Sequence, residues 1–316
     1  MSRIDDTTRV IRLAGPRPGS AAPVRSNQGR AWPVVLVTAT AMVIGGVGWA
    51  VVGADRDGTD PAPVVGAPAV LVHAEALDSA AATYRDYVVA ESAALRAATG
   101  DLVAAVTDRR AASAKAVYPR ARAHWERIQI AAEAVGELGD DIDGQGVGLD
   151  PGETFAGFHR IERDLWQDGF APDTDAVAAT LLADVTALAE GVASVEFTGH
   201  DLCGTAKELI DFAVVTALTG RENRWADTDV ADLAARVEGS RAAVEALRPL
   251  LAAVDPALLT TLDRRFAQTF AVLDAHRVDG VYRLHGELTP ADLKDIAVVL
   301  DALGEPVSRL GATVMV

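Results

Sequence analysis

The chain has 316 residues, half of them hydrophobic and few of them aromatic, and its net charge is −16. This length allows one large domain or two moderate ones, and the acidity argues against nucleic acid as a partner. Alanine, leucine and valine are abundant, which favours an all-helical protein. The single cysteine, Cys203, rules out an internal disulfide.

The N-terminal region predicts a membrane anchor. Residues 1–30 carry arginine, serine, glycine and proline without apolar periodicity, so we expect a disordered segment. Residues 31–54 form an uncharged apolar run with Trp32 and Trp49 near its ends, long enough to cross a bilayer. The arginines before it place the N-terminus in the cytoplasm and the main domain outside. A signal peptide, cleaved after Val52-Gly53-Ala54 or retained, is the alternative.

Residues 55–70 are expected to form a linker, and residues 71–316 a helical domain. Capping residues and helix-stopping glycines predict eight helices in this domain. Their expected ranges are about 71–98, 108–135, from 150 onward, 173–195, 201–218, 228–253, 256–276 and 290–314. Eight helices with short connections predict two four-helix bundles or one elongated bundle. The fold class is therefore all-α, preceded by one transmembrane helix.

The stretch 154–166 contains the first candidate site. On a helix, His159 and Glu162 lie one turn apart, on the arc that is expected to face the core. A histidine and a carboxylate against apolar surface need a partner, because an uncompensated buried charge is costly. A metal cation is one such partner, since imidazole and carboxylate both ligate divalent and ferric ions. A structural hydrogen bond between the two side chains is the alternative.

Two further segments offer acidic side chains. Glu126, on the predicted second helix, flanks the core-facing surface, and an ion pair with Arg122 four residues earlier is the alternative interpretation. The segment 220–229 is either a loop with a helix cap or a second acidic contribution to the same site. If the segment contributes to the site, Asp229 is the candidate metal ligand that it supplies.

These segments resemble the imelysin-like family, in particular its EfeO/EfeM branch. The sequence Gly157-Phe158-His159-Arg160-Ile161-Glu162, followed by Leu165-Trp166, is similar to the Gly-x-His-x-x-Glu motif of that family. Other stretches agree in order along residues 70–316. They are Tyr84-Arg85-Asp86-Tyr87-Val88, Ala121-Arg122 with Trp125-Glu126-Arg127-Ile128, Arg224-Trp225 with Thr228-Asp229, and Glu305-Pro306-Val307-Ser308.

The resemblance implies two four-helix bundles and export from the cytoplasm. It also implies metal binding in an EfeUOB-type iron uptake system, beside a membrane permease and a haem peroxidase. His159 and Glu162 correspond to the family's metal-binding motif, and Glu126 to a carboxylate expected nearby. The expected cargo is iron, as Fe³⁺ or Fe²⁺, with zinc or copper as further candidates. The protein is then similar to the short form of the branch, which lacks a cupredoxin domain.

Two departures and one alternative function qualify the resemblance. Gln129 stands where the branch usually has a second glutamate, and Asp227 where it usually has histidine, so the ligand set is expected to differ. The family is also classed among metallopeptidases, which makes a peptidase the alternative function. The chain has no His-Glu-x-x-His motif and no evident general base, so we expect a binding protein and not an enzyme.

Overall fold

The computed structural model describes residues 67–145 and 155–315, with side chains from His73 onward. The predicted disordered segment, the predicted anchor at 31–54 and most of the predicted linker lie outside the described residues. The expected helix start at Asp150-Pro151 also lies outside them.

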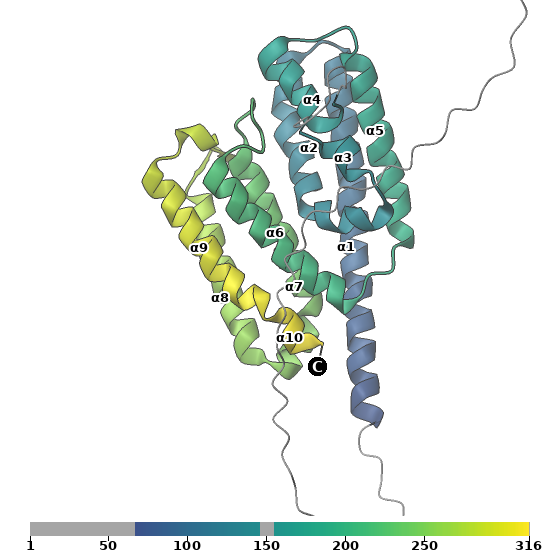
Figure 1. The fold of residues 1–316 in the computed structure, drawn as a ribbon, viewed down its shortest axis with the longest axis vertical. Helices are drawn as coiled ribbons and strands as arrows, with labels where there is room; N and C mark the ends of the chain where they lie inside the picture. Colours follow the sequence, from purple (N-terminus) through teal and green to yellow (C-terminus); the bar gives the residue numbers. More distant parts are fainter. Residues whose placement is uncertain (1–66, 146–154, 316) are drawn as a thin grey trace, which may run out of the picture. The chain divides into compact units, whose positions relative to one another are not determined.

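The described part of the chain is almost entirely helical, which confirms the all-α prediction (Figure 1). The helices are α1 (Ala67–Thr107), α2 (Ala111–Ala132), α3 (Gly139–Asp143), α4 (Gly157–Arg163), α5 (Thr174–Gly191), α6 (Gly199–Thr219), α7 (Asp229–Val254), α8 (Pro256–Asp274), α9 (Pro290–Ser308) and α10 (Leu310–Val314). Short 3₁₀ turns occupy Glu133–Val135, Val192–Ser194 and His285–Glu287, and a π-helical turn, Asp164–Asp168, follows α4.

The helices pack in two sets. In the first, α1 packs on α2 and α5, and α4 packs on α5. In the second, α6 packs on α7 and α9, and α8 packs on α7 and α9. Figure 1 shows the first set in blue to teal and the second in green to yellow. The sets meet where α7 crosses α2 and α1, so side chains of α2 and α7 share one interior.

A glycine sets the distance between α2 and α7. A Cβ atom on Gly239 would lie 2.3 Å from the carbonyl oxygen of Arg127, well inside van der Waals contact. The absence of that atom lets the two backbones approach closely. Polar side chains that precede this contact on each helix, Arg122 and Glu126 on α2 and Asp232 and Arg236 on α7, meet in the interface.

Most predicted helix boundaries are close to the observed ones. Asp255 caps α8 through the backbone N–H of Leu258, and Thr289 forms a capping box with Asp292 at α9. The predicted end of the first helix, near residue 98, was wrong, because α1 runs through Gly100 to Thr107. Leu102 and Val106 continue its buried stripe, and their burial outweighs the cost of about 1 kcal/mol for a helical glycine.

A two-residue hairpin was not expected from the sequence. Arg277–Val278 pairs with Val281–Tyr282 in antiparallel register. Asp279 and Gly280 both have positive φ at the turn, as the tight turns of two-residue hairpin loops require. Strands of this length carry too few residues for an alternating pattern to be recognised.

Among the described residues, one segment is long and apolar enough to cross a membrane by length and composition alone, Thr174–Ser194. It comprises α5 and the following 3₁₀ turn. Its buried side chains include Leu181, Val185 and Leu188, and α5 packs against α1 and α4. Packing in the bundle therefore accounts for the apolar side chains on one face of this segment.

Candidate metal centre

The helix α4 is short and buried on nearly every side. His159 and Glu162 both face the interior, as the sequence predicts. Arg160 and Asp164, on the opposite arc, are buried as well. Arg160 pairs with Asp173 and Asp164, so its charge is compensated inside the bundle.

Both oxygens of the Glu162 carboxylate already have hydrogen-bond partners, and one of them holds the imidazole ring of His159. Its Oε1 accepts hydrogen bonds from the backbone N–H groups of Trp225 and Ala226, at 2.7 and 2.8 Å. Its Oε2 lies 2.8 Å from Nδ1 of His159. Because an ionised carboxylate acts only as an acceptor, Nδ1 carries the proton, and in a neutral imidazole the lone pair of Nε2 is then free. A carboxylate behind a histidine is a common second contact at metal sites.

The lone pair of His159 Nε2 points toward two acidic side chains. Oδ1 of Asp143 lies 3.3 Å from Nε2 and Oε1 of Glu222 lies 3.9 Å from it. Nε2 is buried and finds no hydrogen-bond partner within the described part of the chain. One ligand atom from each of Asp143, His159 and Glu222 lies within 4.8 Å of the others. Metal bonds of about 2.0–2.2 Å place neighbouring ligand atoms roughly 3–4 Å apart, and the distances of 3.3 and 3.9 Å from Nε2 match this spacing.

The glycine of the Gly-x-His-x-x-Glu motif has a structural role in this geometry. Gly157 has φ +73°, and a Cβ atom there would lie 2.3 Å from the carbonyl oxygen of Ile142. Only glycine fits this approach without strain. The start of α4 therefore lies directly against the end of α3, which brings Asp143 beside His159.

The loop between α6 and α7 supplies Glu222. Its backbone N–H donates to Oδ1 of Asp229 at 2.8 Å, so Asp229 fixes the loop from behind. Asp229 is buried, and burial raises the pKa of its carboxyl group. It does not belong to the group of ligand atoms that forms around His159 in residues 67–145 and 155–315. Thr228 precedes α7, but its side chain makes no capping hydrogen bond.

Glu126 lies in the same interior but is held by arginines. Arg122, four residues earlier, pairs with it, as the alternative interpretation predicted. Nε of Arg236 donates to Oε2 of Glu126 at 2.6 Å, and Nε2 of Gln129 donates to the same oxygen at 2.8 Å. Gln129, which departs from the pattern of the branch, therefore supports Glu126 in this chain.

Arg122 and Arg236 connect Glu126 to the candidate ligands Asp143 and Glu222. Arg122 pairs with Asp143, and its Nη2 lies 3.0 Å from Oδ2 of Asp232 and 3.5 Å from Oε1 of Glu222. Arg236 Nη2 lies 3.1 Å from the other oxygen of Glu222. The sequence pattern did not single out Asp143, Asp232 or Arg236. Glu222 lay in the acidic stretch that it did single out.

The buried network carries more acids than bases. The network holds two guanidinium groups and five carboxylates, which leaves three negative charges without a positive partner when every carboxylate is ionised and His159 is neutral. The carboxylates are those of Glu126, Asp143, Glu162, Glu222 and Asp232. Unpaired buried charge is costly, so this interior favours an additional cation.

The pKa values of two acids reflect the competition between burial and the arginines. Burial raises the pKa of Glu126 to about 7, although Arg236 and Arg122 oppose the effect. Burial also opposes ionisation of Glu222, but Arg236 and Arg122 outweigh it and lower the pKa of this carboxyl to about 2. Glu222 is therefore an anion at neutral pH, as a metal ligand must be.

A narrow pocket leads to this group of atoms. It is lined by Gln145, His159, Arg221, Glu222, Arg224 and Trp225. Trp225 stacks on Phe155, with ring centroids 6.5 Å apart, and Arg163 lies over the other ring. Trp225, Arg221 and Arg224 thus line the pocket together with His159.

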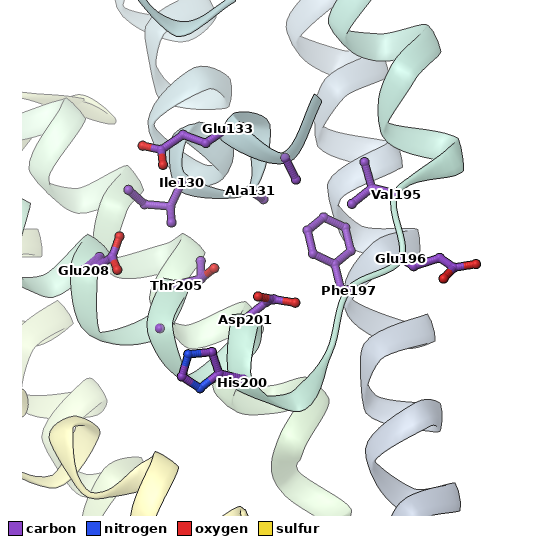
Figure 2. Close-up of a pocket in the computed structure, with 12 residues that line it drawn as sticks. Ile130, Ala131, Glu133, Val195, Glu196, Phe197, His200, Asp201, Thr205 and Glu208 are labelled. Atoms are coloured by element: carbon purple, nitrogen blue, oxygen red, sulfur yellow. The ribbon is translucent and has the colours of Figure 1, made fainter. Parts of the chain in front are cut away.

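A larger pocket of about 390 Å³ contains none of these residues (Figure 2). It lies between the end of α2, the segment before α6, and α6 itself. No lysine or arginine lines it among the residues that the structure describes. The lining residues are Ile130, Ala131, Glu133, Ala134, Val195, Glu196, Phe197, His200, Asp201, Gly204, Thr205 and Glu208. We call it the open acidic pocket.

Sequence comparisons agree with the motif. A model of the imelysin family (Peptidase_M75) matches residues 80–310. The iron uptake system component EfeO of Escherichia coli K12 is 32% identical to this chain over 239 residues, which cover 74% of the chain and 63% of the relative. The proteins of the same name from Shigella flexneri and Shigella sonnei match to the same extent.

The chain thus spans just under two thirds of the length of these relatives. The family match covers most of the described helical domain and includes the segment from Gly157 to Glu162. The chain therefore belongs to the imelysin family, in its EfeO-like branch.

Proposed function

We propose that this protein is the metal-binding component of an iron uptake system, which captures iron outside the cytoplasm and passes it to a membrane permease. The observation that carries the proposal is the convergence of His159 Nε2 with the carboxylate oxygens of Asp143 and Glu222. The names of the relatives point to iron as the cargo.

The donor atoms suit the proposed cargo. One imidazole nitrogen and two carboxylate oxygens are ligands that iron accepts in either oxidation state, and zinc and copper accept them as well. The network carries more acidic than basic groups, which favours a highly charged ion, and we therefore expect Fe³⁺ to bind more tightly than Fe²⁺. Glu162 supports His159 in this proposal, and Glu126 and Asp229 support the arginines and the loop.

We propose a carrier and not a metallopeptidase. A peptidase needs a base that is free to activate water beside the metal. Glu162 already accepts three hydrogen bonds, and Glu126 is held by two arginines and Gln129. Asp143 and Glu222 are used as ligands in this proposal. The test is to incubate the metal-loaded protein with unfolded protein substrates, where metal-dependent cleavage that Glu162→Gln abolishes would reverse the ranking.

The proposed setting follows the resemblance and the N-terminal sequence. The apolar run at 31–54 would anchor the chain in the cell membrane, with its N-terminus in the cytoplasm. An anchor keeps the carrier near its permease and raises the effective concentration for transfer. A haem peroxidase is the other expected partner. A topology reporter fused after residue 66 tests the placement, and reporter activity in the cytoplasm would contradict it.

Metal binding by the full-length chain tests the central proposal. Fe²⁺ under anaerobic conditions and Fe³⁺ are titrated into the wild type and into the variants His159→Ala, Asp143→Asn and Glu222→Gln. We expect each variant to raise the Kd at least tenfold. His200→Ala is the matched control, since His200 is an exposed histidine beside acids in the open acidic pocket. Equal affinity of the wild type and His159→Ala would overturn the proposal.

A further inference from the structure

Arg122 contacts the same two oxygen atoms that face His159. Its Nη1 pairs with Oδ1 of Asp143, and its Nη2 lies 3.5 Å from Oε1 of Glu222. These are the atoms that lie 3.3 and 3.9 Å from His159 Nε2. A guanidinium group therefore already holds the carboxylates that a metal ion would need. A cation on the chain and a cation from solution compete for one pair of oxygens.

We infer that Arg122 is a built-in competitor of the metal, which leaves Asp143 and Glu222 when the metal binds and returns to them when it is released. This inference rests on the proposed function. It assigns to Arg122 a positioning role that sets the affinity and the rate of release, without ligation. A protein that must surrender its cargo to a permease needs such a limit on affinity.

The neighbouring side chains give the displaced guanidinium group a second position. Nε and Nη2 of Arg122 both donate to Oδ2 of Asp232, at 3.2 and 3.0 Å. The other oxygen of that carboxylate, Oδ1, is buried and has no hydrogen-bond partner in the part of the chain that the structure describes. In the proposed second position, Nη1 leaves Asp143 while Nε and Nη2 each take one oxygen of the Asp232 carboxylate. Arg122 then remains paired at two points of the Asp232 carboxylate, a favoured arginine geometry.

The second arginine has a different relation to the ligands. Arg236 contacts Oε2 of Glu222, which is not the oxygen that faces His159, and its Nε is held by Glu126. It can keep both contacts while Oε1 of Glu222 binds a metal. Competition is thus a property of Arg122, and Arg236 provides a comparison within the same network.

The substitution Arg122→Lys tests this role. A lysine side chain places its single nitrogen near the position of the arginine Cζ, one bond short of the two Nη atoms, and cannot bridge to Asp143 and Glu222 as a fork. The charge of the network is unchanged. We expect the variant to bind the metal about tenfold more tightly than the wild type and to release it about tenfold more slowly to a chelator. Arg127→Lys is the matched control, because Arg127 lies on the same helix and pairs with Glu238 and Glu91 outside this network.

The measurement uses the full-length chain and the iron ion, Fe²⁺ or Fe³⁺, for which the wild type shows binding that His159→Ala removes. An unchanged or higher Kd in Arg122→Lys would overturn the inference and leave the metal site intact. Absence of any His159-dependent binding in the wild type would instead refute the proposed function. If Arg122→Lys does not fold, a structure of the metal-loaded wild type decides. An Arg122 that still contacts Asp143 Oδ1 there would overturn the inference, and a bidentate contact with Asp232 would support it.

Discussion

The buried network around His159 and the open acidic pocket contain the same kinds of residues in opposite surroundings. Each holds one histidine and several carboxylates. In the network, the side chains of Arg122, Glu126 and Asp232 have no exposed surface, whereas Glu133, His200 and Glu208 around the pocket are exposed (Figure 2). Exposed acids are satisfied by water, but buried acids require counter-charges. Composition alone therefore does not distinguish the two sites, whereas burial and unmatched charge do.

The pKa directions show the same contrast. Partial burial at the pocket and the charge of Glu208 raise the pKa of Glu133. In the network, Arg236 and Arg122 lower the pKa of Glu222 to about 2 despite burial. The pocket leaves its acids to repel one another, whereas four of the five acids of the network contact an arginine.

The largest expected effect is the loss of a buried arginine. Arg122→Met leaves Asp143, Glu126 and Asp232 without their shared cation, and breaking a buried ion pair from one side costs about 3–5 kcal/mol. Urea unfolding followed by circular dichroism measures the change. Arg120→Met is the matched control two residues away, since Arg120 pairs with Asp101 and both side chains are more than 60% exposed. We expect it to change stability by less than about 0.5 kcal/mol. Equal effects of the two substitutions would contradict the contrast between buried and exposed charge.

The next effect concerns metal affinity. In Glu162→Gln, an amide replaces the acceptor that holds His159 Nδ1–H, so the imidazole loses its fixed tautomer and Nε2 can carry the proton. Removing such a supporting carboxylate typically weakens metal binding by about 10–100-fold. Titration of the full-length chain with iron measures the Kd. Glu208→Gln, in the open acidic pocket, is expected to leave the Kd within about twofold of the wild type. A large effect of Glu208→Gln would show that the general acidity of the domain governs binding.

The sequence predicts the fold where helices depend on local signals. The boundaries at Asp255 and Thr289 follow from side chains that cap their own helix. The continuation of α1 through Gly100 depends on the burial of residues such as Leu102 against other helices, which helix-stopping rules do not include. Tertiary packing decides such boundaries, so local patterns alone do not predict them.

The candidate site was predictable on one helix and not across helices. His159 and Glu162 share a turn of α4, so their spacing indicates that they meet. Asp143 joins them because Gly157 lets α4 approach Ile142, and Glu222 because Asp229 fixes its loop. Both contacts depend on tertiary structure, and the spacing of residues along one chain carries no signal for them.

The pH dependence of stability distinguishes the network further. The pKa of Glu126 rises from 4.5 to about 7 on burial, so the folded protein binds more protons than the unfolded chain within this window. Stability is then lost as pH rises from 4.5 to 7, with a slope of at most about 1.4 kcal/mol per pH unit from this group. We expect Glu126→Gln to flatten the curve of unfolding free energy in that window.

Glu222 contributes with the opposite sign and in another window. Its lowered pKa gives stability that is present above pH 4.5 and lost as pH falls toward 2. The Glu126→Gln variant is therefore expected to keep the acid limb of the curve. If the wild type and Glu126→Gln have the same dependence of unfolding free energy on pH between 4.5 and 7, Glu126 stays ionised in the folded protein.

The smallest expected effect lies in the open acidic pocket. Glu133→Gln removes a charge that burial and Glu208 disfavour, so the variant is expected to be more stable than the wild type at pH 7, by a few tenths of a kcal/mol. The raised pKa of Glu133 means that its unfavourable contribution vanishes below its ordinary value of 4.5, and added salt screens its repulsion by Glu208. Urea unfolding at pH 7 and pH 4, at low and high salt, measures both dependences. Loss of stability in Glu133→Gln at low salt and pH 7 would show that the pocket, like the network, holds a counter-cation.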